Sequence, residues 1–127
     1  MLNDNTPGII SVWMGTTHQS LEEFNAYLEG LDEHQSGSPI QADLGADFID
    51  TDFFVAYGTE DNRTVPVEEL VKEVDCSLDL EPRIVKACYA KGLTEGNSLF
   101  YYKNATFKEP EPGRRYNGLL FIGSFAD

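Results

Sequence analysis

The chain has 127 residues, of which 41% are hydrophobic and 12% aromatic, and its formal net charge at pH 7 is −13. A chain of this size is long enough to bury a packed core, and its apolar content is too high for a disordered acidic tail. The negative charge repels nucleic acid and anionic membranes, so we expect neither as a partner. It attracts basic proteins or cations.

The charge is spread unevenly along the chain. All nine Lys and Arg residues lie from Arg63 onward, whereas the first 62 residues carry twelve acids, from Asp4 to Asp61. The remaining residues carry ten acids against the nine bases. Because self-repulsion at this density opposes compaction, we expect the acidic half to face a basic partner. The alternative is an ordinary solvated acidic surface.

The first half of the chain predicts two strands and two helical segments. An apolar, partly β-branched run at residues 9–14 predicts the first strand. A capping box, Ser20-Leu-Glu-Glu23, begins a helix of about residues 21–29. Its apolar stripe has helical spacing: Leu21, Phe24, Leu28 and Leu31. A helical turn is expected from Pro39 to Leu44, with Gly45 as its stop. An aromatic stretch predicts a strand at about residues 52–57.

The second half predicts two more helices and two more strands. Pro66 opens a short helix at residues 67–73, and a longer helix spans about residues 81–91. Strands are expected at residues 97–103 and 116–125. Because a loop with two prolines joins these last two strands, the pattern favours an antiparallel hairpin between them.

The element order, β-α-(α)-β-α-α-β-β, lacks regular alternation and predicts an α+β fold. We expect a single domain over residues 1–127, with a core at about 9–125. Its antiparallel or mixed four-stranded sheet is expected to have helices packed on one face.

Three features indicate a cytoplasmic protein. The N-terminus has no positive charge of the kind that opens a secretory signal, and no apolar stretch approaches the roughly 20 residues of a membrane span. The two cysteines, Cys76 and Cys88, fit a reducing compartment. Cys88 lies inside a predicted helix and is interpreted as a small buried hydrophobe, although a disulfide between the two remains an alternative.

Residues that carry chemistry are sparse. His18 and His34 lie sixteen positions apart, and the chain has neither a His-x-x-x-His nor a Cys-x-x-Cys pair for zinc. It also lacks a Gly-x-Ser-x-Gly nucleophile turn and a phosphate-binding glycine loop. We therefore expect no catalytic residues, no metal and no cofactor.

One acidic run is the best candidate for a metal site. It contains Asp43, Asp47, Asp50 and Asp52. A calcium loop that starts at Asp50 fails, because Phe54 and Val55 stand where a ligand and a glycine are required. A metal-dependent hydrolase that uses carboxylates of this run remains the alternative function.

The residues expected to contact a basic partner come from the same half of the chain. Strand alternation places Trp13 on one side with Ile9 and Ser11, either at the edge of the core or as an exposed binding hot spot. The full candidate set is Asp43, Asp47, Asp50, Asp52, Glu60, Asp61 and Trp13.

Several spaced patterns recur over residues 9–122. Val12-Trp13-Met14-Gly15 ends the first strand, Ser38-Pro39 leads to Asp43-Leu44-Gly45, and Gly96-Asn97 opens the strand Leu-Phe-Tyr-Tyr. Together these patterns resemble the immunity protein 22 family of bacterial polymorphic toxin systems. The positions that match the family are Trp13, Gly15, Asp43, Gly45, Asp50, Asp52 and Asn97.

The resemblance implies a small cytosolic protein, made beside a toxin gene, that binds and blocks the toxin domain. Such toxins are often nucleases, and a nuclease presents a basic surface to phosphates. An acidic inhibitor occupies that surface by imitating the charge of the substrate. A generic acidic interaction module, with a basic partner unrelated to toxins, remains a further alternative.

Overall fold

Five antiparallel strands form the central sheet of the computed structural model, which describes residues 1–127. Their spatial order is β3-β6-β2-β9-β8, so the middle of the sheet combines strands from both ends of the chain. The strands are β2 (Ile9–Gly15), β3 (Phe54–Gly58), β6 (Ser98–Lys103), β8 (Arg115–Tyr116) and β9 (Leu119–Ala126).

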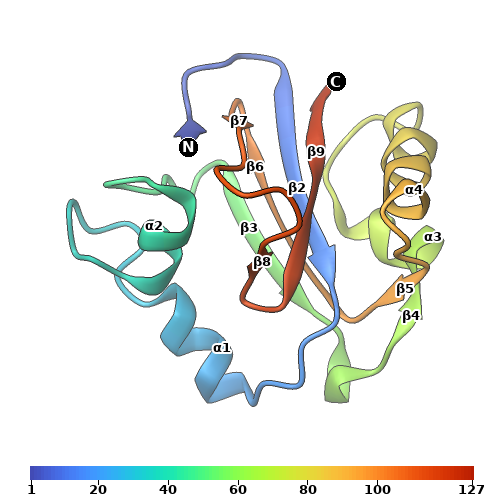
Figure 1. Ribbon diagram of the computed structural model, residues 1–127, viewed down its shortest axis with the longest axis horizontal. Helices are drawn as coiled ribbons and strands as arrows, with labels where there is room; N and C mark the ends of the chain where they lie inside the picture. The colour runs from blue at the N-terminus through green and yellow to red at the C-terminus, as the bar shows by residue number, and fades with distance from the viewer.

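Helices cover both sides of this sheet, with α1 and α2 on one side and α3 and α4 on the other (Figure 1). They are α1 (Leu21–Leu28), α2 (Pro39–Leu44), α3 (Val67–Leu70) and α4 (Leu80–Ala90). Two 3₁₀ turns accompany them, η1 (Glu60–Asn62) and η2 (Val71–Glu73). Two short ribbons pair β1 (Leu2–Asn3) with β7 (Thr106–Phe107) and β4 (Val65–Pro66) with β5 (Glu95–Gly96). No helix is long and apolar enough to span a bilayer.

The predicted Ser20 capping box of α1, and the predicted start of α2 at Pro39 and its end at Gly45, are confirmed. Ser20 Oγ accepts a hydrogen bond from the Glu23 amide, and the Glu23 carboxylate accepts one from the Ser20 amide, each at 3.1 Å. At α2 the Ser38 side chain accepts from the Gln41 amide at 3.3 Å, and Pro39 occupies the first turn. Gly45 ends α2 in the left-handed conformation, at φ 66°, which glycine adopts without a steric penalty.

The two faces of the sheet bury two separate cores, because alternate residues of β2 point to opposite sides. The aliphatic core lies under α3 and α4 and includes Val12, Met14, Leu80, Ile84 and Cys88. The aromatic core lies under α1 and α2 and includes Trp13, Tyr27, Ile40, Leu44, Phe54, Phe100, Tyr102, Phe107 and Tyr116.

The α+β class is confirmed, but three expectations about the sheet are wrong. The sheet has five strands, because Asn117 and Gly118 adopt positive φ of 55° and 85° and divide the expected strand 116–125 into the hairpin β8–β9. Strands β6 and β9 do not pair with each other, since β2 lies between them. Helices cover both faces because residues 10–15 of β2 are buried on both sides.

A β-bulge interrupts the pairing of β2 with β9. Val12 lies opposite Gly123, whereas Trp13 lies opposite Phe121, so Ile122 is an extra residue on β9. After the bulge Ser124 faces Ser11, with their hydroxyl oxygens 2.7 Å apart, and Phe125 packs against the aliphatic core. The extra residue therefore sets which face each later side chain of β9 occupies.

Candidate partner-binding surface

Asp43 is tied into the structure rather than free to meet a partner. Its carboxylate accepts a hydrogen bond from Tyr27 Oη at 2.7 Å and forms an ion pair with Arg114 at 2.6 Å. The Asp43 side chain is 23% exposed. Burial, and then the hydrogen bond to Asp43, raises the pKa of Tyr27. Of the twelve acids before Arg63, Asp43 alone forms an ion pair within the chain.

Asp50 also has a local structural role, at the entry to β3. Its carboxylate accepts a hydrogen bond from the Asp52 amide at 2.9 Å, and its own amide donates to Tyr102 Oη at 2.8 Å. These bonds shape the turn before the strand. Asp47 and Asp52 are exposed, without a hydrogen bond or ion pair at the carboxylate.

The acidic run does not assemble into a metal centre. No group of three or more His, Cys, Asp or Glu side chains is placed to hold a metal ion together. The two partly buried members, Asp43 and Asp50, are occupied by the contacts described above. The geometry therefore gives no support to the alternative of a metal-dependent hydrolase.

Glu60 and Asp61 lie at the opposite end of β3, exposed on η1. The buried side chain of Asn97 holds the adjoining segments in place. Its Nδ2 donates to the backbone oxygens of Thr17 at 2.7 Å and of Asn62 at 3.2 Å, and its Oδ1 accepts from the Thr17 amide at 2.9 Å. This single amide therefore joins the end of β2 to the turn that carries the two acids.

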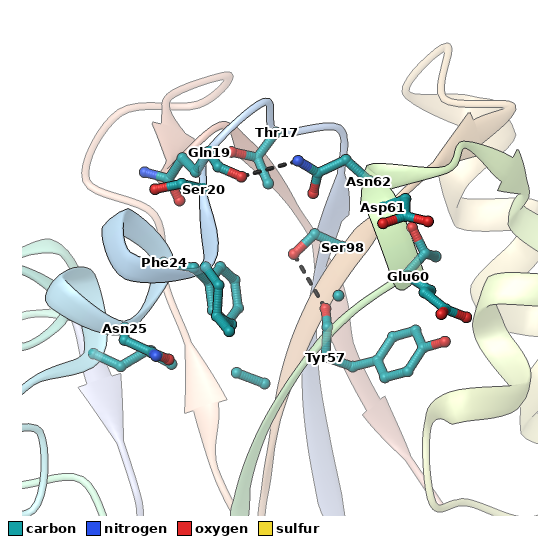
Figure 2. A pocket seen from close by; sticks show the side chains of 15 residues that line it. Thr17, Gln19, Ser20, Phe24, Asn25, Tyr57, Glu60, Asp61, Asn62 and Ser98 are labelled. Carbon is teal, nitrogen blue, oxygen red and sulfur yellow. Dashed lines mark hydrogen bonds between the residues drawn. The ribbon is translucent and has the colours of Figure 1, made fainter.

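A cleft of about 750 Å³ lies between α1, β3 and η1 (Figure 2). Phe24 and Leu21 line it from α1, and Ala56 lines it from β3. Figure 2 shows the Asn62 side chain, at the top of the cleft, donating to the Gln19 backbone oxygen, a bond of 2.9 Å. The only carboxylates in the lining are those of Glu60 and Asp61, and no Lys or Arg is present.

Trp13 is not a surface residue, so its place in the candidate set is corrected. Its side chain is 0% exposed and packs among three rings, Phe100, Phe107 and Phe121, with centroids 5.0 to 5.3 Å away. Its indole Nε1 has no hydrogen-bond partner. Strand alternation placed Trp13 on the side of Ser11, but that side is covered by helices and is not open to solvent.

Apart from Glu60 and Asp61, the residues of the cleft were not identified from the sequence as a site. Leu21 was expected in the buried stripe of the first helix, yet it is 76% exposed. The available signal was the second predicted strand, which contains no Lys or Pro and stands between two pairs of acids. Its position at the edge of the sheet depends on strand order, which periodicity does not reveal.

Comparison with known proteins gives one match. The family model described as Immunity protein 22 matches residues 10–126, nearly the whole chain. No curated protein matches the chain, and no solved structure does. Asn97 and Gly45, two of the positions expected to match the family, have the structural roles described above.

Proposed function

Because the chain belongs to the Immunity protein 22 family, we propose that it binds a cognate bacterial toxin domain in the cytoplasm and neutralises it stoichiometrically. The proposed toxin is a basic protein, and a nuclease fits this description best. The observation that carries this proposal is the segregation of charge. The first 62 residues have no Lys or Arg, and eleven of their twelve acids have no ion-pair partner in the chain.

The proposed toxin-facing acids are those that the fold leaves free. Asp47 and Asp52 are exposed before β3, and Glu60 and Asp61 are exposed after it. Asp43 and Asp50 act as positioning residues for this surface, because their carboxylates are engaged within the protein. Trp13 supports this surface indirectly, as part of the aromatic core beneath it.

Unpaired surface charge of one sign acts mainly on the rate of association. Steered association reaches about 10⁸–10⁹ M⁻¹s⁻¹ at low salt, against about 10⁵–10⁶ M⁻¹s⁻¹ without steering. Fast capture protects a cell from a toxin that degrades its target catalytically. A blocked toxin surface and rapid binding are therefore the two properties that the proposal requires.

A charge-reversal variant tests the proposal. The substitutions Asp47→Lys, Asp52→Lys, Glu60→Lys and Asp61→Lys are expected to slow association with the inactivated toxin domain from the neighbouring gene by about 10²-fold or more at low salt. Stopped-flow measurements over a series of salt concentrations report the rate. The difference from the wild type is expected to shrink as salt screens the charges.

A matched control carries four reversals elsewhere, at Glu69, Glu73, Asp79 and Glu95, which are also exposed. It changes the net charge by the same amount and is expected to retain most of the association rate. If association slowed equally in both variants, the effect would come from net charge alone and not from the proposed surface. Co-expression with the toxin, followed by growth rescue and pull-down, tests neutralisation directly, and no rescue by the wild type would refute the proposed function.

A further inference from the structure

Strand β3 forms one edge of the sheet, and from Ala56 to Gly58 its outer edge is free of backbone hydrogen bonds to the rest of the chain. Its only neighbour is β6, with Phe54 opposite Tyr102 and Gly58 opposite Ser98. Figure 2 looks onto this strand, with α1 on one side of it and α3 and α4 on the other. The cleft lies along this edge.

The pairing with β6 identifies the backbone groups that point outward. The Lys103 amide donates to the Phe53 oxygen at 2.9 Å, and the Thr59 amide donates to the Asn97 oxygen at 2.8 Å. Because hydrogen-bonded and non-hydrogen-bonded pairs alternate in an antiparallel ladder, Val55 and Tyr57 also face β6. The N–H and C=O groups of Ala56 and Gly58 therefore point away from the sheet, and neither residue has a backbone hydrogen bond on that side.

This edge lacks the features that usually prevent strands from pairing with other chains. Edge strands are commonly protected by Lys, Pro, a bulge or a covering loop. The five residues of β3 contain no Lys or Pro, and their register with β6 is unbroken. Apolar side chains flank the edge on both sides, with Val55 41% exposed on one side and Leu21 76% exposed on the other.

The charge around β3 indicates which kind of added strand would pair with its free edge. Asp50 and Asp52 precede β3, and Glu60 and Asp61 follow it, so both ends of the edge are acidic. Lys103, opposite Phe53, is paired with Asp75 at 2.5 Å, and Arg63, which follows η1 in the sequence, does not line the cleft. Antiparallel pairing of two copies of β3 would place the acids of one copy beside those of the other. A second copy is therefore disfavoured, and an extended segment with basic ends is favoured.

We propose that the toxin domain adds a strand to β3 by pairing with the outward backbone groups of Ala56 and Gly58. Alternate side chains of the added strand enter the cleft beside Phe24, and its basic ends meet the acids before and after β3. Five residues of strand span about 17 Å, which is enough for a few main-chain bonds across the edge. This inference rests on the proposed function, since it specifies how the toxin docks.

Amide hydrogen exchange of the wild-type protein tests the inference without a variant. In the complex with the inactivated toxin domain, exchange at Ala56 and Gly58 is expected to slow by about tenfold or more relative to the free protein. The amides of Val55 and Tyr57 are bonded to β6 in both states and serve as the internal reference. Unchanged exchange at Ala56 and Gly58 in a saturated complex would overturn the inference.

A pair of variants at one position separates backbone pairing from side-chain contact. Ala56→Pro removes the outward N–H without breaking a bond to β6 and is expected to weaken toxin binding by about 10- to 100-fold. Ala56→Ser keeps the N–H and is expected to bind within about threefold of the wild type. Isothermal titration measures both affinities, and circular dichroism with thermal unfolding verifies the fold. Equal binding by a folded Ala56→Pro variant would overturn the inference.

The outcomes distinguish the docking mode from the function. If the wild type rescues growth but the exchange and proline results are negative, the toxin docks elsewhere and the proposed function stands. If the wild type does not capture the toxin, the proposed function fails and this inference fails with it. If the free protein sediments as a dimer with Ala56 and Gly58 already protected, the edge belongs to a second copy and the inference is overturned.

Discussion

The two helical layers that cover the sheet differ in charge much more than in burial. The segment that carries α1 and α2, residues 16–53, has nine acids and no Lys or Arg. The segment that carries α3 and α4, residues 59–96, has five bases among its acids. Both layers cover a core of similar size, twelve buried residues against fourteen. Stability is thus shared between the two sides, whereas charge is concentrated on one.

This difference arises from the order in which the chain fills the two sides. After β2 the chain builds the α1–α2 layer, and only after β3 does it build the α3–α4 layer (Figure 1). An uneven distribution of charge along the chain therefore becomes an uneven distribution in space. Ion pairs contribute little to the acidic layer, where Arg114 supplies the one pair. Its stability must come from the aromatic core, and three predictions test this point.

The largest expected effect is on the core beneath the acidic layer. Trp13→Ala removes a fully buried side chain and is expected to lower the free energy of unfolding by about 3–5 kcal/mol, as measured by urea denaturation. Met14→Ala, its neighbour in the aliphatic core, is expected to cost about 2–5 kcal/mol. Leu21→Ala, at an exposed site, is the control and is expected to change stability by less than about 0.5 kcal/mol. If Trp13→Ala lowered the free energy of unfolding only slightly and Met14→Ala lowered it strongly, the two cores would not contribute equally to stability.

An intermediate loss of stability is expected at Asn97, which joins the segment after β2 to the η1 turn. Asn97→Ala leaves the backbone groups of Thr17 and Asn62 without their side-chain partner, at an expected cost of about 1–3 kcal/mol. Faster amide exchange in the turn of Glu60 and Asp61 is expected to accompany the loss. Asn25→Ala, at an exposed position of α1, is the control and should leave both measurements unchanged. Unaltered exchange in the turn of the Asn97 variant would show that Asn97 does not order this turn.

The smallest effect depends on pH and belongs to Tyr27. Because burial raises its pKa in the folded state, the unfolded tyrosine ionises first, near its ordinary pKa of about 10. Its contribution is complete below pH 10 and is lost as pH rises further, by up to about 1.4 kcal/mol per pH unit. Burial also raises the pKa of Tyr116, to about 12, so the wild type is expected to lose stability above pH 10 through both residues.

Urea unfolding between pH 7 and pH 11 measures this loss. Tyr27→Phe is expected to be about 1 kcal/mol less stable than the wild type at pH 7, because Asp43 loses the hydroxyl donor. Above pH 10 the variant is expected to lose stability less steeply than the wild type. Parallel curves for the two proteins would mean that Tyr27 ionises equally easily in the folded and unfolded states.

Local features of this fold were predictable from the sequence, whereas long-range ones were not. The Ser20 capping box and the Gly45 helix end depend on neighbouring residues and were predicted correctly. The fifth strand was missed because the Asn117-Gly118 turn signal was read as part of a continuous strand. Two-sided coverage of the sheet was not predicted, because the alternation of side chains along β2 does not show which elements pack on each face.

The candidate site shows the same limit. The sequence identified the acidic half of the chain. The family match agrees with the resemblance drawn from the sequence patterns. It did not separate free acids from engaged ones, because the partner of Asp43 is Arg114, 71 residues away. Nor did it show that β3 is an edge strand, since that depends on β6 and β9 both pairing with β2.

The bulge at Ile122 has a consequence for how this chain can change length. Surface loops generally accept insertions and deletions, because no side chain downstream changes its environment. Deleting Ile122 would restore simple alternation while Gly123, Ser124 and Phe125 kept their partners on β2 and their faces, because the bulge already absorbs this residue. If the unchanged sequence paired without the bulge, every later side chain would turn to the opposite face, so that the Ser124 hydroxyl would lie in the aliphatic core and the Phe125 ring would lie against Ser11. The position of Ile122 in β9 is therefore expected to tolerate loss of a single residue as the loops do.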